Sequence, residues 1–87
     1  MIIIKDLYPK AKQHYLLIPT KHYADITEMS VSDGRVLGEC LFNLSKLTDK
    51  LGLSGGFRLV SNKGVDAGQT VGHLHVHILG GEKLEEF

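Results

Sequence analysis

The sequence is poor in several features, and each shortage excludes a class of protein. Its 87 residues include a single cysteine, Cys40, which rules out an internal disulfide and makes a reducing cytoplasmic setting the expectation. Ten basic and ten acidic residues leave no net charge to attract nucleic acid or an anionic membrane. The stretch Met1–Lys5 is apolar for far fewer than the ~20 residues of a membrane span. We therefore expect neither nucleic acid nor a membrane as a partner.

The remaining composition is that of an ordinary folded domain. Hydrophobic residues make up 43% of the chain and charged residues 23%, and no low-complexity tract is present. Because typical domains have about 100–150 residues, residues 1–87 are expected to form a single domain. So short a chain buries a smaller fraction of its surface, and a second subunit would therefore matter to its stability.

Four segments have the pattern of strands. They are Met1–Lys5, His14–Ile18, Phe57–Ser61 and Val71–Leu79. The first is rich in β-branched isoleucine, which favours extended backbone, and Pro9 then forces a turn. Pro19 closes the second strand in the same way. Asn62–Gly68 has the composition of a loop, and Gly80–Phe87 that of an acidic tail.

The stretch Ser30–Leu51 is predicted to form one long helix. Its apolar residues recur at spacings of one, three and four, which builds a single stripe that includes Cys40. Ser30 or Ser32 could cap its start, and Gly52 lies where a helix usually stops. The order strand, strand, helix, strand, strand predicts an α+β fold, in which an antiparallel sheet of about four to five strands carries one long helix on one face.

Three histidines alternate with apolar residues near the end of the chain, in the run His73-Leu74-His75-Val76-His77. In a strand, this alternation puts the three imidazoles on one face and the apolar side chains on the other. The imidazoles could simply face solvent, or two of them could share a zinc ion, which would need further ligands. A third hypothesis is nucleophilic attack on phosphorus. A neutral imidazole is a good nucleophile near pH 7 when one ring nitrogen is fixed by a hydrogen bond.

The run His73–Gly81 resembles the signature of the histidine triad family. Further elements of the family pattern occur in order along most of the chain: Asp6–Pro9, His14, Leu17–Pro19, Lys21–His22, Gly56–Asn62 and Ala67–Val71. The trailing Gly80-Gly81 is similar to the branch of purine nucleoside phosphoramidases. The resemblance implies a HIT-like fold and an enzyme that cleaves at the α-phosphate of purine nucleoside phosphoramidates or related nucleotides. It implies a covalent nucleotidyl-histidine, a homodimer and no cofactor or metal.

The resemblance also implies roles for individual residues. His75 would attack the α-phosphorus, with its other ring nitrogen held by a backbone carbonyl. His73 would complete the triad, and His77 and Thr70 would lie near the leaving group. The nucleotide would be bound by residues from four segments: Ile4, Asp6, Leu7, His14, Ile18, Asn62 and Gln69. Of these, Asp6 would grip the ribose, Asn62 and Gln69 would lie near the phosphate, and Ile4, Leu7 and Ile18 would form part of the purine wall.

Several of these residues also have a plain structural interpretation. Asp6 and Asn62 could serve as turn residues, Asn62 in a left-handed conformation, and His14 could be a half-buried strand histidine. His22 is assigned no chemistry. The chain is expected to lack the N-terminal segment and the Trp- and Pro-containing ending of the phosphoramidase branch. Two other functions remain open, a nucleotide-binding interaction module with little turnover and a zinc-binding domain.

Overall fold

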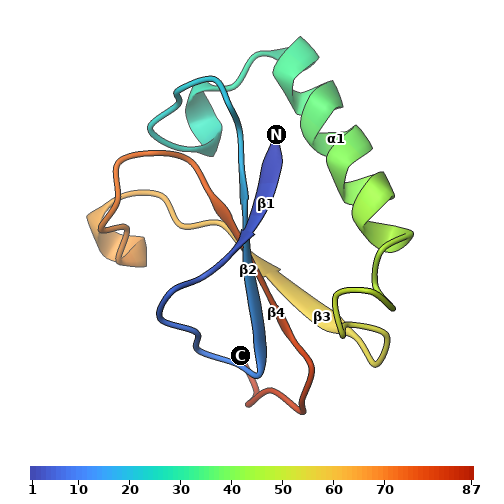
Figure 1. Ribbon diagram of the computed structural model, residues 1–87. Helices are drawn as coiled ribbons and strands as arrows, with labels where there is room; N and C mark the ends of the chain where they lie inside the picture. Colours follow the sequence, from blue (N-terminus) through green and yellow to red (C-terminus); the bar gives the residue numbers. More distant parts are fainter.

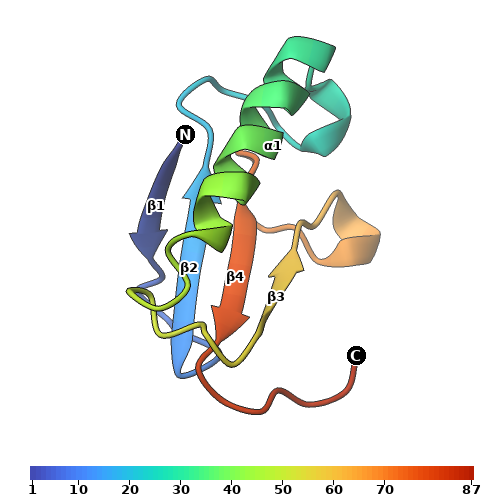
Figure 2. The same cartoon turned by 90° about the vertical axis from the view of Figure 1, so that its right-hand side faces the viewer.

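The computed structural model covers residues 1–87 and contains a four-stranded sheet with one helix against one of its faces (Figures 1 and 2). The elements are β1 (Ile2–Lys5), β2 (Gln13–Ile18), α1 (Val31–Ser45), β3 (Phe57–Val60) and β4 (Val76–Gly80), with short 3-10 turns at Ile26–Glu28 and Val65–Ala67. The strands lie in the order β1-β2-β4-β3, and each neighbouring pair is antiparallel. The predicted α+β class is confirmed. None of the helices has the length and apolar character that crossing a membrane requires.

The register of β2 against β4 decides which side chains enter the core. Leu17 lies opposite Val76 and Tyr15 opposite Ile78, and these side chains share the face that α1 covers. Together with residues from α1 and the following turn they form the buried core: Tyr15, Leu17, Leu44, Leu53, Val76 and Ile78. Since side chains alternate along a strand, His77 and its cross-strand neighbour Leu16 occupy the opposite face of the sheet. That face is turned away from α1 (Figure 1).

The start of α1 agrees with its sequence, but its end does not. Ser30 caps the helix: its side chain accepts from the backbone N–H of Asp33, and the Asp33 carboxylate accepts in return from the backbone N–H of Ser30. The helix ends at Ser45 rather than Leu51, so the predicted end is wrong. The apolar stripe nevertheless continues, because irregular turns after Ser45 still direct Leu51 and Leu53 towards the core. Periodicity alone therefore overestimated the helix.

The prediction for the last strand is wrong at its start. It begins at Val76 rather than Val71, whereas the other three strands differ from their predicted bounds by one residue. The pairing with β2 stops at Leu17 opposite Val76. Two positions further on the partner would be Pro19, which has no N–H to donate to the ladder. The backbone of residues 71 to 75 is therefore held by other contacts, and that segment carries two of the three histidines.

Two parts of the sheet remain uncovered. Figure 2 shows α1 in front of β2 and β4, with β3 standing beside it as an edge strand. Phe57 and Leu59 of β3 are each 40% exposed although they face the helix side of the sheet. On the histidine side, Ile2 and Ile4 of β1 are also exposed. The chain thus presents apolar surface at both edges of its sheet.

Candidate active site

The three histidines of the run lie at the start of β4, where the chain leaves the sheet. His77 is in β4, whereas His73 and His75 belong to the segment before it. All three are half-buried, and the apolar residues between and after them, Leu74, Val76 and Ile78, are buried. The alternation read from the sequence therefore persists through His73 although the regular strand does not. The imidazoles lie on the open side of the sheet.

The ring of His75 is oriented by its own backbone. Its Nδ1 lies 2.8 Å from the carbonyl oxygen of His73. A carbonyl oxygen can only accept, so Nδ1 carries the proton and donates it. In a neutral imidazole the other nitrogen is then unprotonated, and Nε2 of His75 presents a lone pair to the open face of the sheet.

His77 is held by His14 from the neighbouring strand. The backbone N–H of Lys10 donates to His14 Nδ1 at 3.0 Å, so His14 must carry its proton on Nε2. That nitrogen lies 2.8 Å from His77 Nδ1 and donates to it. Asp6 Oδ2 lies 3.4 Å from the same His14 Nε2. His77 accepts on Nδ1, and its own proton is therefore on Nε2, the opposite arrangement to that of His75.

Burial changes the acidity of His77. Removal from solvent disfavours the imidazolium and lowers the pKa of His77 below its ordinary value, and the nearby rings of His75 and His14 lower it further. Asp6 acts in the opposite direction. The ring centroids of His75 and His77 are 4.9 Å apart. His77 is therefore a neutral ring near pH 7 that carries its proton on Nε2, and it neighbours the ring of His75.

His73 is engaged by protein atoms through both ring nitrogens. Its Nε2 lies 3.2 Å from the carbonyl oxygen of Pro19, to which it donates. Its Nδ1 then accepts, and the donor is Nδ1 of His22 at a distance of 2.8 Å. The triad thus lies between two histidine pairs, His14–His77 and His22–His73. Among the three histidines of the run, only His75 has an unprotonated Nε2 that no protein group contacts.

The contact between His14 and His77 also bears on the zinc hypothesis. Asp6, His14 and His77 each offer a ligand atom, and these atoms lie within 4.8 Å of one another. Two imidazole nitrogens on one tetrahedral zinc ion are roughly 3.3 Å apart, because each lies about 2.0–2.1 Å from the metal. The observed separation of 2.8 Å is that of a hydrogen bond. Zinc binding here would require the two rings to move apart.

Comparison with known proteins identifies the family. The protein-family model described as the HIT domain matches residues 1–84 of this chain. The chain belongs to the HIT domain family. A HIT-like protein from Chlamydia muridarum is 40% identical over 83 residues, which cover 95% of this chain and 66% of that relative. The chain thus spans about two thirds of that relative's length.

Solved structures of HIT proteins have the same fold. A histidine triad protein from Clostridium difficile superimposes with a TM-score of 0.87 at 35% identity, covering 98% of this chain and 75% of the other. A HIT family hydrolase from Clostridium thermocellum gives a TM-score of 0.86 at 41% identity over the same shares of the two chains. The four-stranded sheet with one helix thus matches the fold of these two HIT proteins over the part of each that superimposes.

The loop before the histidine segment contributes several of the residues expected near a phosphate in a HIT domain. Val60 lies opposite His77, and continuing this register by two residues brings Asn62 alongside His75. Ser61 Oγ, which donates to the carbonyl oxygen of His75 at 3.5 Å, keeps the two segments together. Asn62 is half-buried and has a negative φ, so the left-handed turn proposed for it is wrong.

Gln69 and Thr70 lie further along the same loop. The Gln69 side chain spans the loop: Oε1 accepts from the backbone N–H of Gly64 at 2.8 Å, and Nε2 donates to the carbonyl oxygen of Ala24 at 2.7 Å and to that of Val71 at 3.1 Å. Thr70 is exposed. Gln69 therefore fixes the loop that leads into the triad. Its side-chain amide already donates to two backbone carbonyls.

The residues expected at the ribose and base lie on the other side of the triad. Asp6 has two contacts: Oδ1 accepts from the backbone N–H of Tyr8 at 2.8 Å, which makes it a turn residue, and Oδ2 approaches His14. Ile4 and Ile18 share the histidine face of the sheet, where Ile4 is 44% exposed. Leu7 is 87% exposed in the turn after β1 and is not packed beside them.

His22 is the residue that sequence reasoning missed. It lies outside the strands, three residues after Pro19, and no periodic pattern links it to the histidine run. Its contact with His73 arises from the path of the chain after β2, which folds back over the segment before β4. Its sequence signals were its place in the Lys21–His22 element of the family pattern and its position in a polar stretch beside a strand end.

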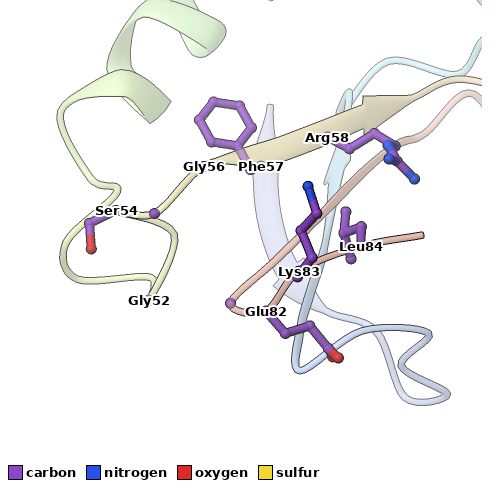
Figure 3. Close-up of a pocket in the computed structure, with 10 residues that line it drawn as sticks. Gly52, Ser54, Gly56, Phe57, Arg58, Glu82, Lys83 and Leu84 are labelled. Carbon is purple, nitrogen blue, oxygen red and sulfur yellow. The ribbon is translucent and has the colours of Figure 1, made fainter. Parts of the chain in front are cut away.

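A hollow of about 630 Å³ lies away from these histidines, at the opposite end of β4 (Figure 3). It is bounded by the glycine-rich turn before β3 and by the start of the tail, with Arg58, Glu82 and Lys83 among its side chains. Its lining contains no histidine. The histidine site is by contrast an open apolar face with polar groups along one end. The hollow and the histidine site are therefore separate features of this protein.

Proposed function

We propose that this HIT family member is a nucleotidyl hydrolase or transferase that cleaves at the α-phosphate of purine nucleoside phosphoramidates or related nucleotides. One observation carries the proposal: the three histidines differ in where their protons lie. His75 donates from Nδ1 to a backbone carbonyl and leaves Nε2 bare. His77 accepts on Nδ1 and keeps a proton on Nε2. A nucleophile and a proton donor thus stand side by side.

The reaction proceeds in two steps. In the first, the Nε2 lone pair of His75 forms a bond to the α-phosphorus, and the bond from phosphorus to the leaving amine breaks. The Nε2 proton of His77 goes to the departing nitrogen, and a proton from solvent replaces it on that ring, so His77 and His14 both stay neutral. In the second step water attacks the same phosphorus, the bond to His75 breaks, and the water proton leaves through His77 to solvent. The products are an amine and a nucleoside monophosphate.

The rest of the nucleotide would lie across the open sheet face. Exposed Ile4 and half-buried Ile18 provide apolar surface suited to a purine, and Leu7 could fold over it from the neighbouring turn. Asp6 Oδ2, which has only the 3.4 Å contact with His14, is a suitable acceptor for ribose hydroxyls. Asn62 and the backbone N–H of Thr70 would donate to the phosphate oxygens, since the N–H of Gln69 already donates to the Gly64 carbonyl.

The test is turnover of adenosine and guanosine phosphoramidates, followed as release of the nucleoside monophosphate, with and without a chelator. The matched control is His75→Ala, measured for both turnover and nucleotide affinity. We expect release that survives the chelator and disappears in His75→Ala, while nucleotide affinity stays nearly unchanged. Nucleotide binding without release from any of these substrates would instead indicate an interaction module. Loss of folding or binding with the chelator would indicate the zinc domain.

We further propose that the working unit is a two-fold homodimer. Phe57 and Leu59 leave apolar surface on the edge strand β3, and Val36 and Leu47 do so along one side of the helix and the turn that follows it. A second copy presenting the same patch could cover both regions and pair the free edge. Size-exclusion chromatography with light scattering should give a dimer mass at micromolar concentrations. A monomer mass there would contradict the proposal, and Leu59→Lys should shift a genuine dimer towards monomer.

A further inference from the structure

The segment after β2 replaces the missing end of the β2–β4 ladder. From Pro19 to Tyr23 the chain contacts the residues before β4 at three points. The Pro19 carbonyl accepts from His73 Nε2, the His22 ring donates to His73 Nδ1, and the Tyr23 carbonyl accepts from the backbone N–H of Leu74 at 2.6 Å. Two of these three contacts hold the ring of His73. The third holds the backbone immediately after it.

We propose that His22 is a positioning residue for His75, acting through His73. This inference rests on the function proposed above, since it concerns the orientation of the nucleophile. Because His22 Nδ1–H donates to His73 Nδ1, the His73 ring is confined to the tautomer that donates to Pro19. Both ring nitrogens of His73 are then hydrogen-bonded, and the bond from the Leu74 N–H to the Tyr23 carbonyl holds the adjoining backbone. The His73 carbonyl in turn fixes the proton of His75 on Nδ1.

The fixed tautomer matters because the wrong one abolishes the nucleophile. If His75 carried its proton on Nε2, no lone pair would face the substrate. Outside the regular strand, few other contacts restrain the His73 carbonyl, and the rings of His22 and His73, with centroids 4.9 Å apart, bridge the two segments. His22 itself is exposed, and its removal leaves the core intact. Its effect is therefore expected on catalysis rather than on folding.

The experiment compares three variants of the complete chain. His22→Ala removes the donor, His22→Asn keeps an N–H close to the position of Nδ1, and Thr20→Ala is the matched control in the same exposed segment. Turnover of adenosine phosphoramidate gives kcat and KM. Nitrogen-15 spectra of the imidazoles give the tautomers of His22, His73 and His75 independently of activity. Thermal unfolding checks that each variant is folded.

We expect His22→Ala to lower kcat about tenfold with KM nearly unchanged, because the nucleophile is misplaced while the nucleotide contacts remain. His22→Asn should restore most of the loss, and Thr20→Ala should behave like the wild type. The spectra should show Nδ1–H on His22 and His75 in the wild type, and a mixture of tautomers for His75 in His22→Ala.

Several results would overturn the proposal. Wild-type kcat in His22→Ala would do so, as would an equal loss in a folded His22→Asn or an Nε2–H tautomer of His22 in the wild type. If the wild-type protein turned over no nucleotide, the proposed function would fail. The tautomers of His73 and His75 in wild type and His22→Ala would still decide whether His22 orders the two rings.

Discussion

The two histidine pairs beside His75 have nearly the same geometry and very different surroundings. The nitrogen atoms are 2.8 Å apart in both, and the ring centroids are 5.1 Å apart in His14–His77 and 4.9 Å apart in His22–His73. His14 is 5% exposed and is tied to a strand and to the backbone of Lys10. His22 is an exposed residue in a loop.

Because the two pairs differ in burial, we expect that breaking each one has a different effect on the protein. In a buried pair, removing one partner leaves the other without a hydrogen bond and without water to replace it, which costs stability. In an exposed pair, water can take the place of the lost partner. The His14–His77 pair is therefore expected to affect folding, acidity and proton delivery together. The His22–His73 pair is expected to affect only the order of the site.

The largest expected effect is a loss of kcat when His77 is removed from the His14–His77 pair. His77→Ala should lower kcat for an alkylamine phosphoramidate by about 10²- to 10⁴-fold, because the departing amine then receives no proton from the enzyme. For an analogue whose leaving group needs no proton, the same variant should lose far less. Steady-state kinetics on the two substrates decides the matter, and equal losses on both would refute the acid role of His77.

The second effect compares the two supporting histidines by stability. His14→Ala should lower the free energy of unfolding by about 2 kcal/mol, because it removes a buried ring and takes away the partner of the Lys10 N–H and of half-buried His77. His22→Ala should change it by no more than about 0.5 kcal/mol, as expected of a surface substitution. Urea unfolding of both variants beside the wild type measures the difference. Similar losses in the two would mean that burial does not separate the pairs.

The contrast between the pairs also shows what the sequence could predict. The buried pair involves residues in strands, and the alternation around His75 together with the pattern of His14–Ile18 placed both histidines on strands of one sheet. Their direct contact depends on the register of β2 against β4, which joins residues 63 positions apart and has no local signal. The family resemblance supplied the roles of the triad, and residue spacing alone would have left three hypotheses open.

The exposed pair could not be predicted because it depends on where regular structure stops. Pro19 was recognised as the end of a strand, yet its effect on the partner strand was not: without an N–H at Pro19, β4 starts at Val76. The segment before β4 then needs other contacts, and His22 supplies one. The end of α1 at Ser45 is a similar case, since the apolar stripe continues in turns that keep only isolated helix-type hydrogen bonds, such as that from the Leu51 N–H to the Leu47 carbonyl.

A smaller effect concerns pH and again belongs to the buried pair. The pKa of His77 in the folded protein is below the ordinary value of 6.5. As pH falls through 6.5, His77 becomes protonated in the unfolded chain but stays neutral in the folded chain. The free energy of unfolding therefore falls. This contribution is fully present above the unfolded pKa and is lost as pH falls towards the folded pKa.

Urea unfolding between about pH 7.5 and about pH 5.5 should therefore show a falling free energy of unfolding in the wild type. His77→Asn should make that fall shallower, and Thr20→Ala should leave the wild-type slope unchanged. The same slope in His77→Asn and the wild type would show that His77 is not the group responsible.

The central claim is that His75 becomes covalently bonded to the nucleotide through the Nε2 that its contact with His73 leaves bare. Rapid quenching of the protein with adenosine phosphoramidate, followed by intact and peptide mass spectrometry under conditions that preserve phosphorus–nitrogen bonds, tests it directly. The account predicts an added nucleoside monophosphate on His75 that forms and decays during turnover and is absent from His75→Ala. Turnover without any adduct, or an adduct on another residue that persists in His75→Ala, would contradict it.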